Sequence, residues 1–446
     1  MKVLLIDPSA RRFMYTMHKG KIPRSHRYPG LGLTTLAALC PADVEVSIID
    51  DEFEQIDFRN LPDLAGISLL TYSASRGYQI AREFRQRGVP VVLGGSHVTA
   101  CPDEAKLEAE AIVTGEAEDT WPQLLQDFRS GAMKPVYRST NQASLKDQPM
   151  ARRDLLRPEN YITVNTIQAT RGCPFNCEFC SIAALFGHKT RCRPVEEVIA
   201  EIKTFKGRYF VFNDDNLGQE HEYYKNLFAQ LIPLKKKWLS NASWNIMQDS
   251  EMLKLMRQSG CCGLFIGFES IQAQQGVRKT GAAANGDADR RQLYTEVVRK
   301  LHRSGIAVMG AFIFGFDNDD EGVFGQTLEF ARQSRIDAAQ INLLVPYPGT
   351  PLYARLKKEG RLREQDWNWF RSWHVCFEPE HMTRQVLQEK YLWFRRKFNS
   401  YPHIARRSLN SMARSSPRIS ALCLGVNLGS KRDLRFIPRQ EYAGKG

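Results

Sequence analysis

The 446-residue sequence predicts an α/β protein with two consecutive parallel sheets and then a smaller, mostly helical region. Twice along the chain, short runs rich in Val, Ile and Leu alternate with amphipathic stretches, which is typical of strands covered by helices on both faces. A chain of this length suits two or three domains. We expect a first domain at residues 1–130, a linker at 131–160, a second domain at 161–360 and a C-terminal region at 361–446.

The first domain is expected to be a doubly wound, Rossmann- or flavodoxin-like sheet of five strands. The expected strands are 3–7, 44–50, 65–70, 89–94 and 111–114, and the expected helices are 31–39, 75–87, 103–108 and 120–128. Such a sheet binds ligands outside the carboxyl ends of its strands. The first strand is followed by neither Gly-Lys-Ser/Thr nor Gly-x-Gly-x-x-Gly, so a nucleotide is not favoured there.

The second domain is expected to contain six strand–helix units. Its strands are predicted at 163–169, 209–213, 239–244, 263–269, 307–316 and 339–346, and its helices at 195–205, 221–234, 250–258, 289–304, 321–335 and 352–359. Six units are short of the eight that close a full barrel, so the pattern indicates a partial, TIM-like (β/α)6 barrel. Active sites in such barrels lie at the carboxyl ends of the strands.

Three cysteines, Cys173, Cys177 and Cys180, follow the first predicted strand of this barrel. Gly172 and Pro174 place a turn there, so the three thiols can converge on one metal centre. A cubane iron–sulfur cluster normally takes four thiolates, and three would leave one iron open. The alternative is a structural zinc site, which needs four ligands and would take Cys192 or His188 as the fourth.

The spacing Cys-x3-Cys-x2-Cys, with Phe179 before the last cysteine, resembles the signature of the radical S-adenosylmethionine (SAM) enzymes. The resemblance implies that Cys173, Cys177 and Cys180 hold a [4Fe–4S] cluster whose open iron chelates SAM, and that SAM is cleaved to a 5′-deoxyadenosyl radical. It also implies SAM contacts from within the cysteine motif and from residues at later strand ends. These are Phe179, Asn213, Asp214, Asp215, Glu269 and Gly310.

Paired carboxylates at 214 and 215 suit an ammonium group, but Asp also caps helices, and chemistry alone leaves both roles open. The family pattern does not say which aspartate contacts SAM. Hydrogen abstraction by a radical needs no general base from the protein, so the absence of an obvious acid–base pair does not argue against this chemistry, and we assign no catalytic residue.

Two loops of the first domain, Leu-Gly-Gly-Ser-His-Val-Thr at 93–99 and Val-Thr-Gly-Glu-Ala-Glu at 113–118, resemble the cobalamin-binding domain fused to many radical SAM enzymes. The resemblance implies that the loop after the third strand faces the lower side of the corrin and that the other two surround the nucleotide tail. The implied contacts are Thr71, Tyr72, Ser73, Gly94, Gly95, His97, Val98, Thr99, Gly115 and Glu116. Asp-x-His-x-x-Gly is absent, so no histidine is expected on cobalt, and His97 either contacts the tail or hydrogen-bonds its own loop.

Together these resemblances imply a cobalamin-dependent radical SAM enzyme, with methyl transfer to an unactivated carbon as the leading activity. The implied cofactors are a [4Fe–4S] cluster, SAM and cobalamin. An oxidative cyclase or rearrangement enzyme with the same cofactors is the alternative, and a non-enzymatic sensor binding zinc and cobalamin is a remote one. The expected partners are a small-molecule or lipid-like substrate and a flavodoxin- or ferredoxin-type electron donor, without nucleic acid.

The C-terminal region combines aromatic and basic residues. Trp367, Trp369, Phe370, Trp373 and Phe377 form either core or a lid over an apolar substrate, and a helix is expected at 383–397. The net charge is +13, and residues 401–446 hold nine Lys or Arg against two acids. With no apolar run near the roughly 18 residues that span a bilayer and no signal peptide, we expect a cytoplasmic protein. Basic residues 406–418 and apolar residues 419–428 would allow weak contact with the inner membrane face.

Overall fold

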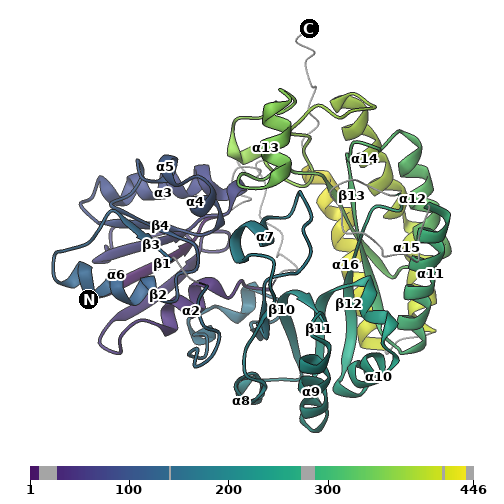
Figure 1. The fold of residues 1–446 in the computed structure, drawn as a ribbon, viewed down its shortest axis with the longest axis horizontal. Helices are drawn as coiled ribbons and strands as arrows, with labels where there is room; N and C mark the ends of the chain where they lie inside the picture. The colour runs from purple at the N-terminus through teal and green to yellow at the C-terminus, as the bar shows by residue number, and fades with distance from the viewer. Residues whose placement is uncertain (10–27, 140–141, 273–286, 414–416, 438–446) are drawn as a thin grey trace.

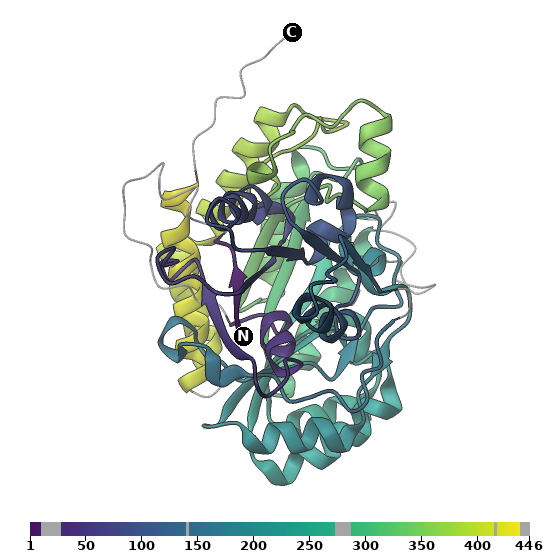
Figure 2. The ribbon, with the colours of Figure 1, turned by 90° about the vertical axis from the view of Figure 1, so that its left-hand side faces the viewer.

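The computed structural model describes residues 1–9, 28–139, 142–272, 287–413 and 417–437. Two parallel sheets of six strands each lie side by side with their own helices, and further helices follow at the C-terminus (Figure 1). In the view from the side of the first sheet, its elements lie in front of the strands of the second (Figure 2). The predicted α/β fold, with a doubly wound first sheet and a partial barrel, is confirmed.

The first sheet has the strand order β2-β1-β3-β4-β5-β6. Its strands are β1 (Lys2–Asp7), β2 (Glu45–Asp50), β3 (Leu64–Ser68), β4 (Val91–Gly94), β5 (Ala111–Thr114) and β6 (Val136–Arg138). The expectation of five strands was therefore wrong, because β6 lies in the stretch expected to be a linker. It has only three residues and no apolar run, and it is held by Tyr137, whose hydroxyl donates to Asp127 at 2.8 Å.

Separate apolar cores cover the two faces of this sheet. One core is formed with α3 (Ala74–Arg85), which buries Tyr78, Ile80 and Phe84. The other contains Trp121, Leu124 and Leu125 of α6 (Thr120–Arg129). The remaining helices are α2 (Gly32–Ala38), α4 (Ser96–Ala100) and α5 (Pro102–Ala105). Both faces are thus covered, as near-continuous apolar strands require.

The second sheet has the order β14-β13-β12-β11-β10-β7, and every pairing is parallel. Its strands are β7 (Thr166–Ile167), β10 (Tyr209–Leu217), β11 (Lys237–Ser243), β12 (Cys261–Glu269), β13 (Ala307–Phe314) and β14 (Ala338–Leu343). The helices that follow them are α8 (Val195–Thr204), α9 (His221–Leu231), α10 (Ser250–Ser259), α11 (Asp287–Arg303), α12 (Gly322–Gln333) and α13 (Pro351–Lys358). The chain therefore forms the six expected strand–helix units.

Three C-terminal helices complete the fold: α14 (Arg384–Phe398), α15 (Tyr401–Met412) and α16 (Pro417–Asp433). Helix α16 packs on the barrel, where Ile419 and Cys423 contact Cys262 and Ala307. The adjacent strand residues Cys261 and Val308 point the other way, into the core that the sheet forms with helices α8–α12. Helix α16 therefore covers the opposite face of the sheet. The apolar stretch 419–428 is therefore partly core. Among the described residues, no helix is long and apolar enough to cross a membrane.

The aromatic cluster lies between the two domains. Phe370 and Phe377 are fully buried, and Trp367 Nε1 donates to Glu104 of α5 at 2.9 Å. Arg371 Nη2 donates to the carbonyl of Tyr72, in the loop after β3, at 3.1 Å. The cluster is thus mainly interdomain core, the first of the two roles expected for it.

Candidate active site

The cysteine loop runs from β8 (Thr170–Arg171) to α7 (Ser181–Phe186), and β9 (Arg191–Cys192) pairs with β8 in antiparallel orientation. At its start, Gly172 has a φ of +92° and donates its N–H to Asp215 Oδ2 at 2.8 Å. A Cβ atom at Gly172 would lie 2.3 Å from the carbonyl oxygen of Lys189. Only glycine fits this entry to the loop.

All three cysteines lie on this loop. Cys177 is buried, Cys173 and Cys180 are partly exposed, and Cys180 N–H donates to the Cys177 carbonyl at 3.1 Å. Burial, together with the smaller effect of the charges of Cys177, Cys173 and Glu269, raises the pKa of Cys180 to about 11. The Cys180 thiol is therefore protonated at neutral pH without metal, and binding of a metal centre to it would release a proton.

This donor set fits a cluster better than a closed zinc site. Cys192 lies opposite Thr170 on β9 and faces the charges of Asp214 and Glu220 rather than the other thiols. Within the described part of the chain, no three His, Cys, Asp or Glu side chains lie close enough to hold a single metal ion. Three thiols without a fourth are the set that leaves one iron of a cubane open.

Asp214, on β10, holds the backbone that leads into the cysteine loop. Its Oδ1 accepts from Ala169 N–H at 2.7 Å and Thr170 N–H at 3.1 Å, and its Oδ2 accepts from Tyr224 OH at 2.6 Å. The side chain is buried, and burial raises the pKa of Asp214 to about 7 despite these donors. The structure thus gives Asp214 a backbone-binding role, close to the capping alternative.

Asp214→Asn should change how stability depends on pH. In the native protein the Asp214 carboxyl stays protonated up to about pH 7, whereas in the unfolded chain it ionises near pH 4. The contribution of this carboxyl to the unfolding free energy is therefore fully present below about pH 4 and is lost as the pH rises through 7. From about pH 5 to 8, the unfolding free energy of the variant minus that of the wild type should rise by on the order of 2 kcal/mol. Urea unfolding at several pH values measures this difference, and a constant or falling difference contradicts the assignment.

Asn216 is a site residue that the sequence reasoning missed. Its Nδ2 lies 3.4 Å from Cys173 Sγ, and its Oδ1 accepts from Ser243 Oγ at 2.6 Å. Asp215, the partner of Gly172, lies one residue before it. The sequence did offer a signal for Asn216, because it belongs to the same polar run at the end of the strand, 213–216, as the two predicted aspartates.

Of the other predicted SAM contacts, Phe179 lies in the cysteine loop itself and the rest lie on strands of the barrel. Glu269 ends β12 with a φ of +60°, a strained conformation for a residue other than glycine, and its charge reaches Cys180. Phe179 contacts the ring of Phe316 at 5.9 Å. Asn213 is partly exposed on β10. Gly310 does not face the cysteine loop. A Cβ atom at Gly310 would point into the core, toward Ile336, Phe268 and Phe312.

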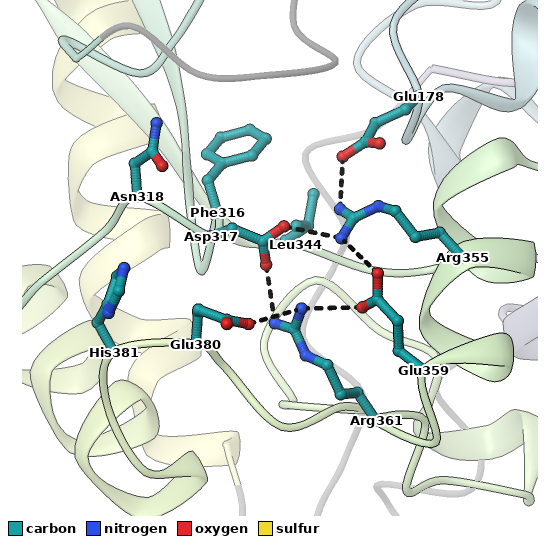
Figure 3. Close-up of a pocket in the computed structure, with 10 residues that line it drawn as sticks. All are labelled: Glu178, Phe316, Asp317, Asn318, Leu344, Arg355, Glu359, Arg361, Glu380 and His381. Atoms are coloured by element: carbon teal, nitrogen blue, oxygen red, sulfur yellow. Dashed lines mark hydrogen bonds and ion pairs between the residues drawn. The ribbon is translucent and has the colours of Figure 1, made fainter.

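A pocket of about 490 Å³ lies between the cysteine loop and the carboxyl ends of β13 and β14 (Figure 3). Arg355 of α13 pairs there with Glu178, between two of the cysteines, at 2.9 Å and with Asp317 at 2.8 Å. Arg361 also pairs with Asp317, at 2.7 Å. Burial alone would raise the pKa of Asp317, but the two arginines bring it below its usual range. These ion pairs fix the outer side of the cysteine loop to α13.

The glycine loop of the first domain is tightly built. Gly95 has a φ of +98°, and a Cβ there would lie 2.7 Å from the Leu69 carbonyl. Thr99 Oγ1 donates to the Gly95 carbonyl at 3.0 Å and accepts from Gly115 N–H at 3.0 Å. Gly94 is partly exposed, and Val98 is fully buried.

His97 is completely buried, and its Nε2 lies 3.2 Å from Tyr78 OH and 3.6 Å from Glu104 Oε1. Its Nδ1 is buried without a hydrogen-bond partner. An orphaned polar atom in this loop is what a site for a polar ligand group would leave without that ligand. The residues present therefore fit the nucleotide tail of cobalamin.

The remaining predicted cobalamin contacts divide into two groups. Thr71 and Ser73 are buried and Tyr72 is partly exposed in the turn after β3, where Ser73 Oγ bonds the backbone of Leu70. Glu116 lies elsewhere: its carboxylate is held by Arg171 and Arg191 beside the cysteine loop. The structure thus gives Glu116 a role between the domains that the sequence reasoning did not predict.

Comparison with known proteins defines the class. The family description "B12 binding domain" matches residues 22–125, and "Radical SAM superfamily" matches residues 167–331. The chain is therefore an enzyme with a cobalamin-binding domain followed by a radical SAM domain, and its cofactors are a [4Fe–4S] cluster, SAM and cobalamin.

Relatives make the assignment more specific. Bacteriochlorophyllide d C-12(1)-methyltransferase of Chlorobaculum tepidum is 32% identical over 89% of this chain and 87% of its own length. The chain belongs to the cobalamin-dependent radical SAM methyltransferases. Anaerobic magnesium-protoporphyrin IX monomethyl ester cyclase of Cereibacter sphaeroides is 25% identical over 76% of this chain and 60% of its own length. The methyltransferase TsrM of Kitasatospora setae, solved with cobalamin and a [4Fe–4S] cluster, shares the fold with a TM-score of 0.61 at 17% identity, over 80% of this chain and 75% of its own.

Proposed function

We propose that this enzyme transfers a methyl group to a peripheral carbon of a chlorophyllide-like tetrapyrrole. The observation that carries the proposal is the identity to the bacteriochlorophyllide methyltransferase, which runs through both sheet domains and covers 87% of that relative. The chain also offers partly exposed aromatic faces, Trp369 and Trp373, beside the loop after β3. Flat aromatic side chains suit a flat aromatic substrate.

We infer that Cys173, Cys177 and Cys180 hold the cluster and that the loops 71–73 and 94–99 hold cobalamin. When bound, the cluster supplies an electron to SAM and cobalamin carries the methyl group. The chain's own contribution is to fix these groups relative to each other and to the substrate. Asp214, Asp215 and Asn216 hold the cysteine loop, and Phe370 and Phe377 are fully buried between the domains.

Anaerobic turnover tests the function. Reconstituted enzyme with SAM, a reductant and bacteriochlorophyllide d should give deoxyadenosine and a product heavier by one methylene unit. The cyclase of Cereibacter sphaeroides motivates a second candidate. That reaction would also form deoxyadenosine from SAM, but it would convert a porphyrin ester without adding a methyl group. Deoxyadenosine without a methylated tetrapyrrole would rule out the first candidate.

We infer that a flavodoxin- or ferredoxin-type protein delivers the electron and that the enzyme works in the cytoplasm. A reduced flavodoxin should replace the chemical reductant in the same turnover assay. No product with flavodoxin, together with normal product with dithionite, would argue against this kind of donor.

We infer, in addition, that the outer side of α15 contacts an anionic membrane surface. Tyr401, Leu409 and Met412 are each about two-thirds exposed (65%, 68% and 65%) and lie on one side of this helix with the exposed Arg406. An exposed apolar stripe beside basic residues is typical of helices that lie on anionic lipid. The apolar side of α16, by contrast, packs against the barrel through Ile419 and Cys423.

Leu409→Glu should reduce co-sedimentation with phosphatidylserine vesicles by roughly fivefold, because it places a charge in the apolar stripe. Leu107→Glu is the matched control, since Leu107 is 76% exposed on the first domain. Equal sedimentation of the wild type and both variants would remove the membrane proposal.

A further inference from the structure

A cluster of buried ion pairs joins the first domain to the cysteine loop. Glu116, which follows β5, accepts from Arg171 Nη1 at 2.9 Å and from Arg191 Nη1 at 3.0 Å, and its second oxygen pairs with Arg191 Nη2. Glu118 pairs with Arg171 at 2.6 Å. The side chain of Glu116 is only 4% exposed. Both oxygens of a buried carboxylate are therefore engaged by two guanidinium groups.

The two arginines belong to the structure that carries the cysteines. Arg171 ends β8 two residues before Cys173, and its register partner on β9 is Arg191. The pair of strands brackets the loop from both sides. The carboxylate of Glu116 in the first domain thus bonds both strands, β8 and β9, that flank the cysteine loop.

Hydrogen bonds extend from this cluster in both directions. Toward the predicted cobalamin site, Thr99 Oγ1 connects Gly115 N–H to the Gly95 carbonyl, with both distances 3.0 Å. Toward the cysteines, Gly172 N–H, next to Arg171, donates to Asp215 at 2.8 Å. The predicted cobalamin loop and the cysteine loop are thus connected without a break through short backbone and side-chain contacts.

We propose that Glu116 is a positioning residue that sets the place of the cysteine loop relative to the first domain. Resting on the proposed function, this contact couples SAM cleavage to methyl transfer, because a radical made at the wrong distance from the methyl donor decays without product. Small misplacements in such sites cost large factors in rate. Removing Glu116's charge would leave two buried cations without their shared partner, which loosens the hairpin.

A second buried triad provides a matched control. Glu201 of α8 is held between Arg153 and Arg193, and its side chain is 2% exposed. Like Glu116, Glu201 is bonded by two arginines, and these arginines also bond the carbonyls of Thr166 and Gln168. Glu201→Gln therefore removes an equally buried charge next to the same hairpin, where Arg193 bonds Ala169 and Gln168, but leaves the contact between Glu116 and the cysteine loop in place.

The first test is hydrogen–deuterium exchange of the amides at 172–180. Glu116→Gln should speed their exchange by roughly tenfold relative to the wild type, whereas Glu201→Gln should leave it unchanged. Glu116→Asp, which keeps the charge, should fall between the wild type and Glu116→Gln. Equal exchange in the wild type and Glu116→Gln, or equal acceleration in Glu116→Gln and Glu201→Gln, would overturn the proposal.

The second test is the amount of deoxyadenosine formed per methylated product. This ratio should rise roughly tenfold in Glu116→Gln at unchanged iron and cobalamin content, and stay at the wild-type value in Glu201→Gln. A ratio unchanged in Glu116→Gln would overturn the coupling role. If the wild type forms no methylated product, the proposed function fails, but the exchange measurement still decides whether Glu116 positions the loop.

Discussion

Cys177→Ala protein is expected to contain almost no iron after anaerobic reconstitution and to form no deoxyadenosine from SAM. Cys177 is the buried member of the triad, and its carbonyl also accepts the N–H of Cys180. A cubane normally takes four ligands and the predicted set supplies three, so we expect the two remaining thiolates to hold it poorly. Iron and sulfide analysis, with the visible absorbance of the cluster, measures the first effect, and chromatography of deoxyadenosine measures the second.

Cys192→Ala is the control for this experiment. Cys192 is close in sequence but lies on β9, opposite Thr170. This variant should load iron as the wild type does. Wild-type iron content in Cys177→Ala, or loss of iron in Cys192→Ala, would show that the ligands have been assigned to the wrong thiols.

Gly172→Ala should lose most of its cluster although it removes no ligand. The φ of +92° costs a residue with a Cβ on the order of 1–3 kcal/mol. In addition, the new atom would lie 2.3 Å from the rigid Lys189 carbonyl, so the start of the loop must move. The N–H that bonds Asp215 moves with it. Iron content per chain and the melting temperature of the cluster-free protein report the two consequences.

Gly325→Ala is the corresponding control. Gly325 lies in α12 with no atom within 4 Å of the added Cβ, so alanine should be neutral or stabilise by about 0.5–1 kcal/mol. Its iron content should equal that of the wild type. If Gly172→Ala matched it in both iron and melting temperature, the left-handed turn would not be essential for the loop.

Most of the fold could be predicted from the sequence because its signals are local and strong. The buried strands of both sheets are apolar runs, and the helices between them have a clear period. Strand β6 was missed because three residues at a sheet edge carry no period of their own. Its place depends on Tyr137 reaching Asp127, a contact ten residues apart that depends on the fold.

The site was predictable to the extent that it is local in sequence. Cys173, Cys177 and Cys180 stand together, so the sequence favours a metal centre there, and this ligand set stays a prediction. The partners of Glu116 lie 55 and 75 residues away along the chain, so the sequence shows an acidic loop but not what it binds. The backbone role of Asp214 likewise depends on β10 lying beside the end of β7.

The placement of α16 has a consequence for biosynthesis. Its partners on the barrel, Cys262 and Ala307, leave the ribosome long before Ile419 does. Synthesis proceeds at roughly 5–20 residues per second. For several seconds, therefore, the surface around Cys262 and Ala307 is exposed to solvent and to other chains before α16 covers it. Expression versions that stop before α16 should consequently aggregate, and chaperones that shield the unfinished barrel should raise the yield of the full-length enzyme.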